Sequence, residues 1–447
     1  MTKVITYGTF DLFHEGHYRL LERAKALGDY LIVGVTTESY DKRRGKLNVV
    51  DSLATRIDNV KKTGFADEIV IEEEVGQKIR DIQRYGVDIF TVGSDWEGKF
   101  DYINKYCKVV YLERTKNISS TMLREKNYKI LSIGVIGTGR IANRFMPEQT
   151  LVSGIEAQAV YNPNPQSAEA FAKKHELDAY SNLDAFLEVV DAVYIASPHE
   201  THYEYAKKAL NAGKHVLCEK PLVFSKEQAS ELFAIAKEKN LILFEGIKTA
   251  YCPGFVQLLN VAQSNVIGEI KYVDACFTKL EKPTNRELTD LKYGGSMTEL
   301  GSYCLLPAVK IFGKEYEDVS FDSIKNDDGL DIFTRISLKY PSGIASLTCG
   351  LGVKSEGRLL IGGTKGYIVA EAPWWKTTYF EVHYENAYEL DRYADRFLGD
   401  GLRYEIADFL TQINGRQESA FKLTREESIT MAGIMEKFLN GRTDTTL

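Results

Sequence analysis

Apolar residues along the chain recur with strand and helix periods, and the pattern starts twice. A β-branched and aromatic run at residues 4–7 ends at Gly8 and precedes apolar positions at helical spacing within residues 17–25. The same order returns at residues 130–136, which precede the glycine-containing segment 137–142 and a further helical pattern. The sequence therefore predicts two strand–turn–helix units that each open a domain.

A short polar segment at residues 124–129 separates these two stretches, so we expect domains at 1–128, 129–250 and 251–447. In the second domain strands alternate with helices, which favours a parallel sheet covered on both faces. The expected strands are 157–161, 192–196, 215–218 and 241–244, and the expected helices are 167–175, 201–212 and 225–239, with Ser225 as N-cap.

After about residue 265 strand patterns follow one another and indicate an open, mostly antiparallel sheet. These strands are expected at 272–279, 333–340, 344–351, 358–361 and 366–370. Helices at 404–413 and 425–438 end the pattern. The fold class is therefore α/β with a final α+β domain.

Composition narrows the possible functions. The 447 residues carry 56 Lys and Arg against 63 Asp and Glu, a net charge of −7 that disfavours nucleic-acid binding. No apolar run reaches the roughly 18–20 residues that span a bilayer, and the N-terminus lacks a signal-peptide pattern. Six scattered cysteines without a CxxC pair suit free thiols. We expect a cytoplasmic protein with no membrane partner and no structural metal site.

The segment Gly8–His17 carries the first candidate chemistry, because two histidines three residues apart begin a helix. Main-chain N–H groups at a helix N-terminus favour phosphate, and imidazoles there can stabilise charge that develops during phosphoryl transfer. The alternative is a surface loop with two unrelated histidines.

Residues 1–125 resemble the nucleotidyltransferase superfamily, specifically the glycerol-3-phosphate cytidylyltransferases, through GTFDLFHEGH, GSDWEGKFD at 93–101 and VYLERTKNISST at 110–121. The resemblance implies transfer of a cytidylyl group from CTP, with Mg²⁺, to a phosphorylated polyol, with release of pyrophosphate. It implies catalytic roles for His14, His17, Lys46 and Arg114, and nucleotide binding by Gly8, Thr9, Phe10, Arg56, Asp95, Thr115, Ser119 and Ser120. Asp11 and Trp96 lie in the same motifs. Lys116 and Asn117 depart from the usual Glu-Gly, which leaves the acceptor open.

The turn Gly137-Thr-Gly-Arg140 can let a pyrophosphate approach the main chain at a helix N-terminus, although a tight turn without a ligand has the same pattern. With SPHETH at 197–202, CEKPL at 218–222 and GGSMTELGSYC at 294–304, residues 130–447 resemble the oxidoreductase family of glucose–fructose oxidoreductase, inositol dehydrogenase and dihydrodiol dehydrogenase. The resemblance implies a Rossmann domain that binds NAD or NADP. The cofactor contacts that it implies are Gly137, Thr138, Gly139, Arg140, Ile141, Asn162, Ser197, Pro198, His199, His202, Glu219 and Lys220.

The same resemblance assigns Lys220 to the nicotinamide and the substrate oxygen, and Tyr303 to acid–base catalysis. Leu306 stands where many family members have an acid, three residues after a histidine that is Tyr303 here. We expect the Lys220 ammonium to lower the pKa of Tyr303 from the usual value of about 10. Tyr303 packing in a core is the alternative. Asn162 is neither the acid typical of NAD sites nor the Arg typical of NADP sites, so both cofactors stay possible.

Together the two resemblances predict a bifunctional, homo-oligomeric enzyme. One half would reduce a sugar or phosphosugar carbonyl to a polyol phosphate, and the other would couple that product to CTP for capsule or teichoic-acid-like polymers. Reduction of a CDP-linked carbonyl, one half acting as a nucleotide sensor, and ATP in place of CTP are the alternatives.

Overall fold

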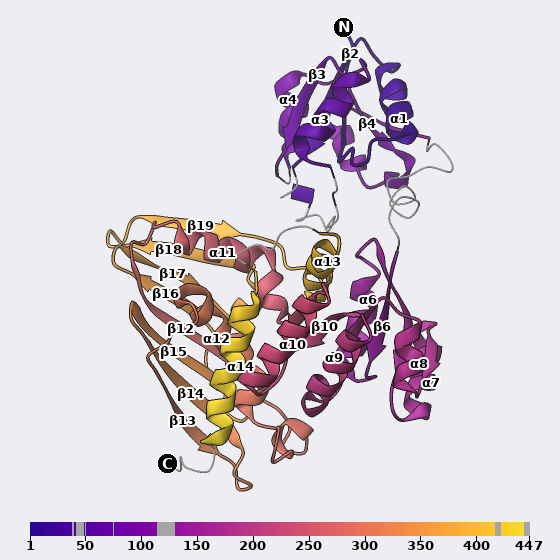
Figure 1. The fold of residues 1–447 in the computed structure, drawn as a ribbon. Helices are drawn as coiled ribbons and strands as arrows, with labels where there is room; N and C mark the ends of the chain where they lie inside the picture. Colours follow the sequence, from indigo (N-terminus) through magenta and orange to yellow (C-terminus); the bar gives the residue numbers. More distant parts are fainter. Residues whose placement is uncertain are drawn as a thin grey trace. The chain divides into compact units, whose positions relative to one another are not determined.

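The structure is a computed structural model that describes residues 1–37, 40–41, 49, 51–74, 76–113, 130–415 and 422–441. The chain divides into two compact units, Met1–Ile130 and Leu131–Leu447, and each is described by itself (Figure 1). Within the described residues, no helix has the length and apolar character needed to cross a bilayer.

The first unit is a five-stranded parallel sheet with helices on both faces. Its strand order is β3-β2-β1-β4-β5. The strands are β1 (Lys3–Gly8), β2 (Tyr30–Thr36), β3 (Glu68–Glu72), β4 (Ile89–Gly93) and β5 (Lys108–Leu112). The helices are α1 (Glu15–Lys25), α3 (Leu53–Lys62) and α4 (Gln77–Tyr85), with short 3-10 turns η1 (Ser94–Trp96) and η2 (Asp101–Lys105).

Alternation along the strands divides the core of this unit into two layers. Val4 packs with Leu21 of α1 and Val60 of α3 on one face. Its neighbour Ile5 packs with Ile82 of α4 on the other face. The strand order reverses between β1 and β4, and ligands of doubly wound sheets bind beyond the carboxyl ends of the strands at such a point.

The second unit begins with a six-stranded parallel sheet of order β11-β10-β9-β6-β7-β8. Its strands are β6 (Leu131–Ile136), β7 (Ile155–Tyr161), β8 (Asp178–Tyr180), β9 (Ala192–Ile195), β10 (His215–Glu219) and β11 (Leu243–Gly246). Its helices are α6 (Arg140–Gln149), α7 (Pro165–His175), α8 (Leu183–Glu188), α9 (His202–Asn211) and α10 (Lys226–Glu238), and η3 (His199–Thr201) precedes α9.

An eight-stranded sheet of order β13-β14-β15-β12-β16-β17-β18-β19 follows in the same unit. Its strands are β12 (Ile270–Thr278), β13 (Asp318–Lys325), β14 (Asp331–Tyr340), β15 (Gly343–Gly350), β16 (Leu359–Gly363), β17 (Gly366–Ala370), β18 (Tyr379–Tyr384) and β19 (Leu390–Ala394). Neighbouring strands are antiparallel except for β12 and β15, which run parallel. The remaining elements are η4 (Lys248–Tyr251), α11 (Pro253–Gln263), η5 (Arg286–Leu288), α12 (Ser296–Phe312), η6 (Trp374–Lys376), α13 (Leu402–Ile413) and α14 (Arg425–Asn440).

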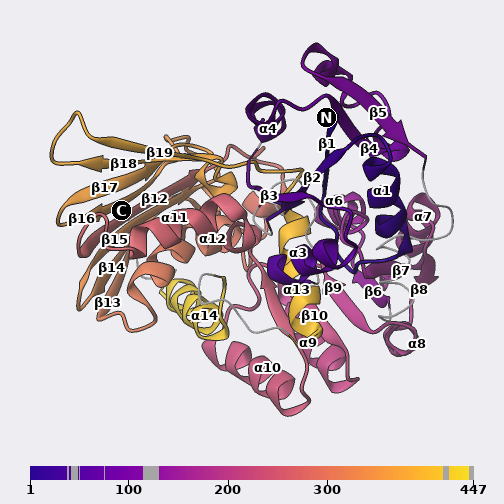
Figure 2. The ribbon, with the colours of Figure 1, turned by 90° about the horizontal axis from the view of Figure 1, so that it is seen from above.

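Helix α12 packs along one face of this sheet, against β12, β14 and β15 (Figure 2). Its N-terminus is fixed because Asp331, the first residue of β14, accepts a hydrogen bond from the main-chain N–H of Met297 at 2.8 Å. The Ser296 hydroxyl donates to the main-chain oxygen of Asp331 at 3.1 Å. This anchoring sets the position of every side chain on the helix.

The α/β prediction is confirmed, and the final sheet is mostly antiparallel as predicted. Helix α12 was not predicted, because its side chains are apolar and buried on almost every side and therefore lack an amphipathic period. Ser225 precedes α10 as expected, but its side chain makes no capping hydrogen bond.

Candidate functional sites

The turn between β1 and α1 has a constrained main chain. Phe10 and Leu12 have φ values of 53° and 47°, in the left-handed region that costs a non-glycine residue about 1–3 kcal/mol. A Cβ at Gly8 would lie 2.9 Å from the ring of Phe10, so only glycine fits below that ring. Such strain persists only where surrounding contacts impose it, as at a ligand loop.

The two histidines of the motif lie together at the start of α1. Their rings stack with centroids 3.9 Å apart and planes inclined by 20°. His14 is the N-cap, and its Nδ1 accepts from the main-chain N–H of Gly16 at 3.0 Å. The rings of Phe10 and Phe13 each lie 5.5 Å from that of His17. Two imidazoles at a helix N-terminus form a suitable site for phosphate oxygens.

Asp41 forms hydrogen bonds that stabilise the loop between β1 and α1. Its carboxylate is fully buried and accepts from the hydroxyl groups of Thr9 at 2.9 Å and Thr36 at 2.6 Å. Arg56 is also fully buried, with Nη1 3.7 Å from the Asp41 carboxylate. The same Nη1 donates to the main-chain oxygens of Thr9 at 2.8 Å and Thr36 at 2.7 Å. Arg56 therefore supports the loop through its main chain, and its contact with a phosphate stays a prediction.

A second carboxylate supports the same turn. The main-chain N–H of Leu12 donates to Asp51 at 2.8 Å, and that of Asp51 donates to the buried Asp11 at 2.8 Å. Asp41 and Asp51 were not singled out from the sequence, because neither belongs to a motif. Their pairing with the loop depends on the fold.

A buried polar cluster lies near the carboxyl ends of β1 and β3. The hydroxyl of Tyr7 donates to Asp81 at 2.8 Å, and Lys78 pairs with Glu72 while its Nζ lies 4.5 Å from the centre of the Tyr7 ring. Burial and Asp81 raise the pKa of Tyr7, so its phenol stays protonated. This cluster could not be predicted from the sequence, since Lys78 and Asp81 lie in a largely polar helical segment.

Five of the expected residues lie outside the described part of the chain: Lys46, Arg114, Thr115, Ser119 and Ser120. The backbone of Asp95 lies in η1, next to Trp96, whose side chain is largely exposed.

In the second unit, the turn after β6 brings the main chain at Gly137 close to the main chain at Ala196. Gly137 has a φ of 104°, and a Cβ there would lie 2.6 Å from the main-chain oxygen of Ala196. Gly139 is the N-cap of α6, with open space around the position of its absent Cβ. The N-terminus of α6 is thus uncovered at the carboxyl edge of the sheet, which suits a pyrophosphate.

The other expected cofactor contacts on this side surround the turn. Asn162, which follows β7, donates from Nδ2 to the hydroxyl of Thr138 at 2.9 Å. Arg140 is exposed and pairs with Glu287 at 3.2 Å, and Ile141 is half-buried on α6. These positions fit a dinucleotide without distinguishing NAD from NADP.

His202 connects the loop after β9 to the loop after β10. Its ring nitrogens lie 2.9 Å from the main-chain oxygen of Pro221 and 3.0 Å from that of Ser197. The Ser197 hydroxyl in turn lies 2.7 Å from that of Thr201, and Pro198 leads into η3. His202 is completely buried, and burial lowers its pKa.

Lys220 lies between the end of β10 and α12. Its Nζ donates to the main-chain oxygen of Glu299 at 2.8 Å and lies 3.4 Å from the Glu299 carboxylate. The same Nζ is 5.9 Å from the ring centre of Tyr303. Burial, with Lys220 adding to it, lowers the pKa of His199, whose Nε2 lies 3.7 Å from Glu299. The residues expected from two distant motifs therefore meet in one place.

Glu299 was not predicted from the sequence, because the acid of many family members stands three residues after the position of Tyr303. It lies four residues before Tyr303 instead, one turn earlier on α12, and so shares a helix face with it. Recognising residues 296–312 as a helix would have revealed this relationship.

The expected lowering of the Tyr303 pKa by Lys220 is wrong. Burial raises the pKa of Tyr303 well above its ordinary value, and the nearby carboxyl groups of Glu219 and Glu405 add to this effect. Tyr303 therefore stays protonated at neutral pH and can act as a proton donor.

The cytidylyltransferase-like family model matches residues 5–126. The model of the oxidoreductase family with an NAD-binding Rossmann fold matches residues 131–247, and that of the GFO/IDH/MocA C-terminal domain matches 255–369. Glycerol-3-phosphate cytidylyltransferase of Bacillus subtilis is 46% identical over 126 residues, 28% of this chain and 97% of that protein. The scyllo-inositol 2-dehydrogenase (NADP(+)) IolU of the same organism is 30% identical over 319 residues, 69% of this chain and 96% of that protein. The chain belongs to both families.

Among solved structures, the second unit is similar to the 3-ketoreductase KijD10 from Actinomadura kijaniata in complex with NADP and TDP-benzene. The TM-score is 0.60 at 25% identity, and the match covers 68% of this chain and 96% of that one. The chain therefore joins a cytidylyltransferase unit to an NAD(P)-dependent oxidoreductase unit.

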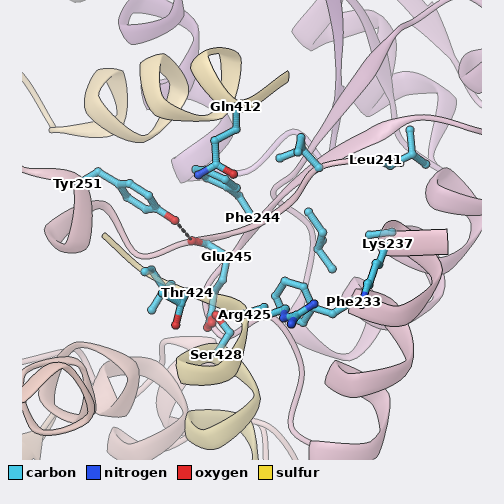
Figure 3. A pocket seen from close by; sticks show the side chains of 14 residues that line it. Phe233, Lys237, Leu241, Phe244, Glu245, Tyr251, Gln412, Thr424, Arg425 and Ser428 are labelled. Atoms are coloured by element: carbon cyan, nitrogen blue, oxygen red, sulfur yellow. Dashed lines mark hydrogen bonds between the residues drawn. The ribbon is translucent and has the colours of Figure 1, made fainter. Parts of the chain in front are cut away.

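Two buried acids flank Lys220 in the oxidoreductase unit. The hydroxyl of Tyr194 donates to Glu219 at 2.6 Å. On the next strand, Glu245 accepts from the main-chain N–H of Leu222 at 3.0 Å. Burial raises the pKa of Glu245 to about 7. Glu245 also lines a cavity of about 140 Å³ beneath β11, with side chains from α10, α13 and α14 (Figure 3). These contacts position the Lys220 loop from both faces of the sheet.

A bound NAD(P) supplies or accepts a hydride in enzymes of this family. The Gly137 turn and the α6 N-terminus fit its pyrophosphate, and Lys220 with Tyr303 lies at the same carboxyl edge of the sheet. Lys220 can orient and polarise a carbonyl oxygen while Tyr303 protonates it.

Proposed function

We propose that this chain makes a CDP-activated polyol by two reactions. The oxidoreductase unit reduces the carbonyl of a sugar phosphate to a polyol phosphate, and the cytidylyltransferase unit couples that phosphate to CTP and releases pyrophosphate. The observation that carries the proposal is the combination, in one chain, of a reductive site with a protonated Tyr303 beside Lys220 and a unit similar to enzymes named for glycerol 3-phosphate. A reductase yields an alcohol, and the transferase uses a phosphorylated alcohol.

In the cytidylyltransferase unit we assign transition-state stabilisation to His14 and His17, supported by Lys46 and Arg114, with Mg²⁺ bound to the CTP phosphates. We assign the nucleotide to the loop from Gly8 to Phe10 and to the segment that contains Thr115, Ser119 and Ser120. The domain limits that go with these roles are 1–128, 129–250 and 251–447.

In the oxidoreductase unit we assign proton donation to Tyr303 and orientation of the carbonyl oxygen to Lys220. The product would supply capsule or teichoic-acid-like polymers, and we place the reaction in the cytoplasm, where the six free cysteines stay reduced. We also propose a homo-oligomer formed through the open sheet.

A second order of reactions is favoured by one observation. The similar KijD10 structure holds TDP-benzene, so a related 3-ketoreductase binds a nucleotide-linked compound. The oxidoreductase unit could accordingly reduce a CDP-linked carbonyl after cytidylyl transfer.

A reconstitution with the full chain tests both orders. The chain is mixed with NADH or NADPH and with dihydroxyacetone phosphate or ribulose 5-phosphate, with and without CTP, and both nicotinamide absorbance and pyrophosphate are followed. The proposal expects nicotinamide oxidation without CTP, and pyrophosphate only after reduction. Nicotinamide oxidation that depends on CTP supports the second order, and no oxidation under any of these conditions contradicts the proposed reduction.

The variant His17→Ala makes the order unambiguous. Under the proposal it releases no pyrophosphate but still oxidises the nicotinamide at the wild-type rate. Under the second order it stops both reactions.

A further inference from the structure

Two consecutive residues of η5 form ion pairs with two different loops at the Rossmann sheet. Arg286 donates from Nη2 to both carboxylate oxygens of Glu200, at 3.0 Å and 2.7 Å. Glu287 accepts from Nη2 of Arg140 at 3.2 Å. Glu200 lies in η3 after β9, and Arg140 is the first residue of α6 after β6. Neighbouring side chains of opposite charge are therefore paired with two separate loops.

An aromatic contact forms a third attachment. The ring of Tyr293 stacks on that of Phe224, with centroids 5.6 Å apart and planes inclined by 15°. Phe224 follows β10, four residues after Lys220, and its ring lies 5.8 Å from that of His199. Residues 285–294, which we call the bridging segment, are therefore attached to the loops that follow β6, β9 and β10.

Hydrogen bonds within the bridging segment give it a compact fold of its own. The main-chain N–H of Asp290 donates to the oxygen of Arg286 at 2.9 Å. That of Gly295 donates to the oxygen of Glu287 at 2.8 Å. The N–H of Gly294 donates to the oxygen of Asp290 at 2.8 Å, and a Cβ at Gly294 would lie 2.6 Å from the same oxygen. The bridging segment is therefore a tight turn rather than an extended loop, and it leads directly into α12.

The three loops that hold the bridging segment are the ones that fit a dinucleotide. The Gly137 turn and the α6 N-terminus suit a pyrophosphate, while His202 and Lys220 lie in the loops after β9 and β10. In doubly wound sheets the dinucleotide lies across the carboxyl ends of the strands. A segment attached to all three loops crosses that same edge of the sheet.

We propose that the bridging segment encloses NAD(P) bound at the carboxyl edge of the Rossmann sheet, and that its two ion pairs break before the cofactor leaves. Arg286 and Glu287 are then positioning residues that slow cofactor release and take no part in proton or hydride transfer. The inference goes beyond the proposed function, because it concerns cofactor binding and holds for any carbonyl compound that the unit reduces.

Arg140 can hold the bridging segment and an anion at the same time. Its guanidinium carries five N–H donors, and the contact with Glu287 involves one nitrogen. A pyrophosphate at the α6 N-terminus brings negative charge next to Arg140. A change of Glu287 would therefore alter the pyrophosphate contact as well as the attachment. The pair between Arg286 and Glu200 is the better target for a test.

The first experiment measures cofactor release and needs no substrate. Full-length protein loaded with NADPH is mixed with excess NADP⁺, and the loss of nicotinamide fluorescence gives the dissociation rate. We expect Glu200→Gln and Arg286→Met to release NADPH about threefold to fivefold faster than the wild type, which is the range for an exposed ion pair. Glu231→Gln breaks a pair of similar exposure with Lys207, between α9 and α10, and should release NADPH at the wild-type rate.

The double variant Glu200→Gln/Arg286→Met shows whether the pair acts as a unit. If the contact itself retains the cofactor, the double variant releases NADPH at the rate of Arg286→Met. Effects of the two changes that multiply would overturn the role of the pair. A wild-type rate in both single variants would also overturn the proposal, as would a wild type that binds no NADPH.

Hydrogen exchange distinguishes this role from a structural one. The main-chain N–H groups of Gly294 and Gly295 are hydrogen-bonded within the bridging segment, so their exchange rates report on its fold. We expect these rates to be the same in the cofactor-free wild type and in cofactor-free Glu200→Gln. Faster exchange in the variant would show that the ion pair maintains the fold of the segment, and this result would overturn the proposal.

Discussion

Lys220 donates a hydrogen bond to the main-chain oxygen of Glu299 at 2.8 Å, one helical turn before Tyr303. The ammonium group is thereby held between the end of β10 and α12. Since the acceptor is a main-chain oxygen, a change of the Glu299 side chain leaves this contact in place. The position of Lys220 therefore depends on the main chain of Glu299 and not on the charge of the Glu299 side chain.

The Lys220→Met variant removes the ammonium and keeps most of the side-chain length. We expect the rate of carbonyl reduction to fall by about 10²-fold or more, because the carbonyl oxygen loses its orienting positive charge. Glu299→Gln is the matched comparison. It removes the carboxylate at 3.4 Å from Nζ but keeps the main-chain acceptor of Lys220, so we expect only a several-fold change. Nicotinamide absorbance measures both rates. An equal loss of rate in the two variants would contradict this expectation, and NADPH binding by each variant reports on intact folding of the oxidoreductase unit.

The pH dependence of reduction follows from Tyr303. Burial raises the pKa of Tyr303 above its ordinary value of 10.0, so the proton donor is present across the neutral range and is lost only above that value. We expect the reduction rate to lack an alkaline decline due to Tyr303 up to about pH 9, whereas alcohol oxidation, which needs the tyrosinate, should rise with pH. Profiles of kcat in both directions test this expectation. A decline in reduction near neutral pH that Tyr303→Phe removes would contradict it.

The motifs of the sequence were sufficient to predict Lys220 and Tyr303 as partners, because each belongs to a recognisable segment. Their electrostatic environment was not predictable. Glu405 lies about a hundred residues after Tyr303 in a helix whose pattern gives no sign of chemistry. The packing of α13 against α6 buries that carboxyl group in the oxidoreductase unit. Burial of Tyr303 itself is the main cause of its raised pKa, and Glu219 and Glu405 only add to it.

In the cytidylyltransferase unit, Asp41→Asn tests how the nucleotide loop is held. Asp41 accepts hydrogen bonds from Thr9 and Thr36 and lies beside the buried Arg56. An amide removes the negative charge beside the buried guanidinium, so we expect a loss of about 3 kcal/mol of unfolding free energy and a higher KM for CTP. Asp58→Asn removes an exposed pair with Lys62 and should change neither quantity measurably. Denaturant titrations and CTP kinetics of the two variants test this expectation. A wild-type KM for CTP in Asp41→Asn would contradict a role of Asp41 in holding the nucleotide loop.

For the loop between β1 and α1, the sequence motif predicts the ligand chemistry but not the contacts that support the loop. The sequence indicated that residues 8–17 surround a phosphate, and the stacked imidazoles of His14 and His17 are consistent with that expectation. It did not indicate that Arg56 would be completely buried under the loop. A basic residue looks the same in sequence whether it faces a ligand or the main-chain oxygens of Thr9 and Thr36.

Two glycines of the cofactor turn should differ in their tolerance of alanine. At Gly137 a Cβ would collide with the main-chain oxygen of Ala196, and the φ of 104° is strained for alanine. We expect Gly137→Ala to lower both stability, by about 1–3 kcal/mol, and NADPH affinity. Gly139 has an ordinary φ and open space around it, so Gly139→Ala should fold normally and lose only affinity, through crowding of the pyrophosphate. Thermal unfolding and NADPH fluorescence titrations distinguish these results, and an unaltered Gly139→Ala affinity would place the cofactor elsewhere.

The contact between Arg403 and Glu148 should carry a pH-dependent share of stability. Burial alone would raise the pKa of Glu148, but hydrogen bonds from Arg403 and from two main-chain N–H groups lower it below the ordinary 4.5. A lowered pKa in the folded state stabilises the protein above the unfolded value, and this stabilisation is lost as the pH falls through the folded value. We expect Arg403→Met to cost about 3–5 kcal/mol at neutral pH, because the side chain of Glu148 is only 6% exposed.

The same reasoning sets the control and the measurement. Arg392→Met breaks an exposed pair with Glu381 and should cost less than about 1 kcal/mol at any pH. Denaturant unfolding of the oxidoreductase unit, identified by its response to NADPH, is measured for both variants from neutral pH down to below pH 4.5. The difference between wild type and Arg403→Met should shrink as Glu148 becomes protonated. A difference that stays constant over this range would show that the arginine stabilises α13 by packing alone.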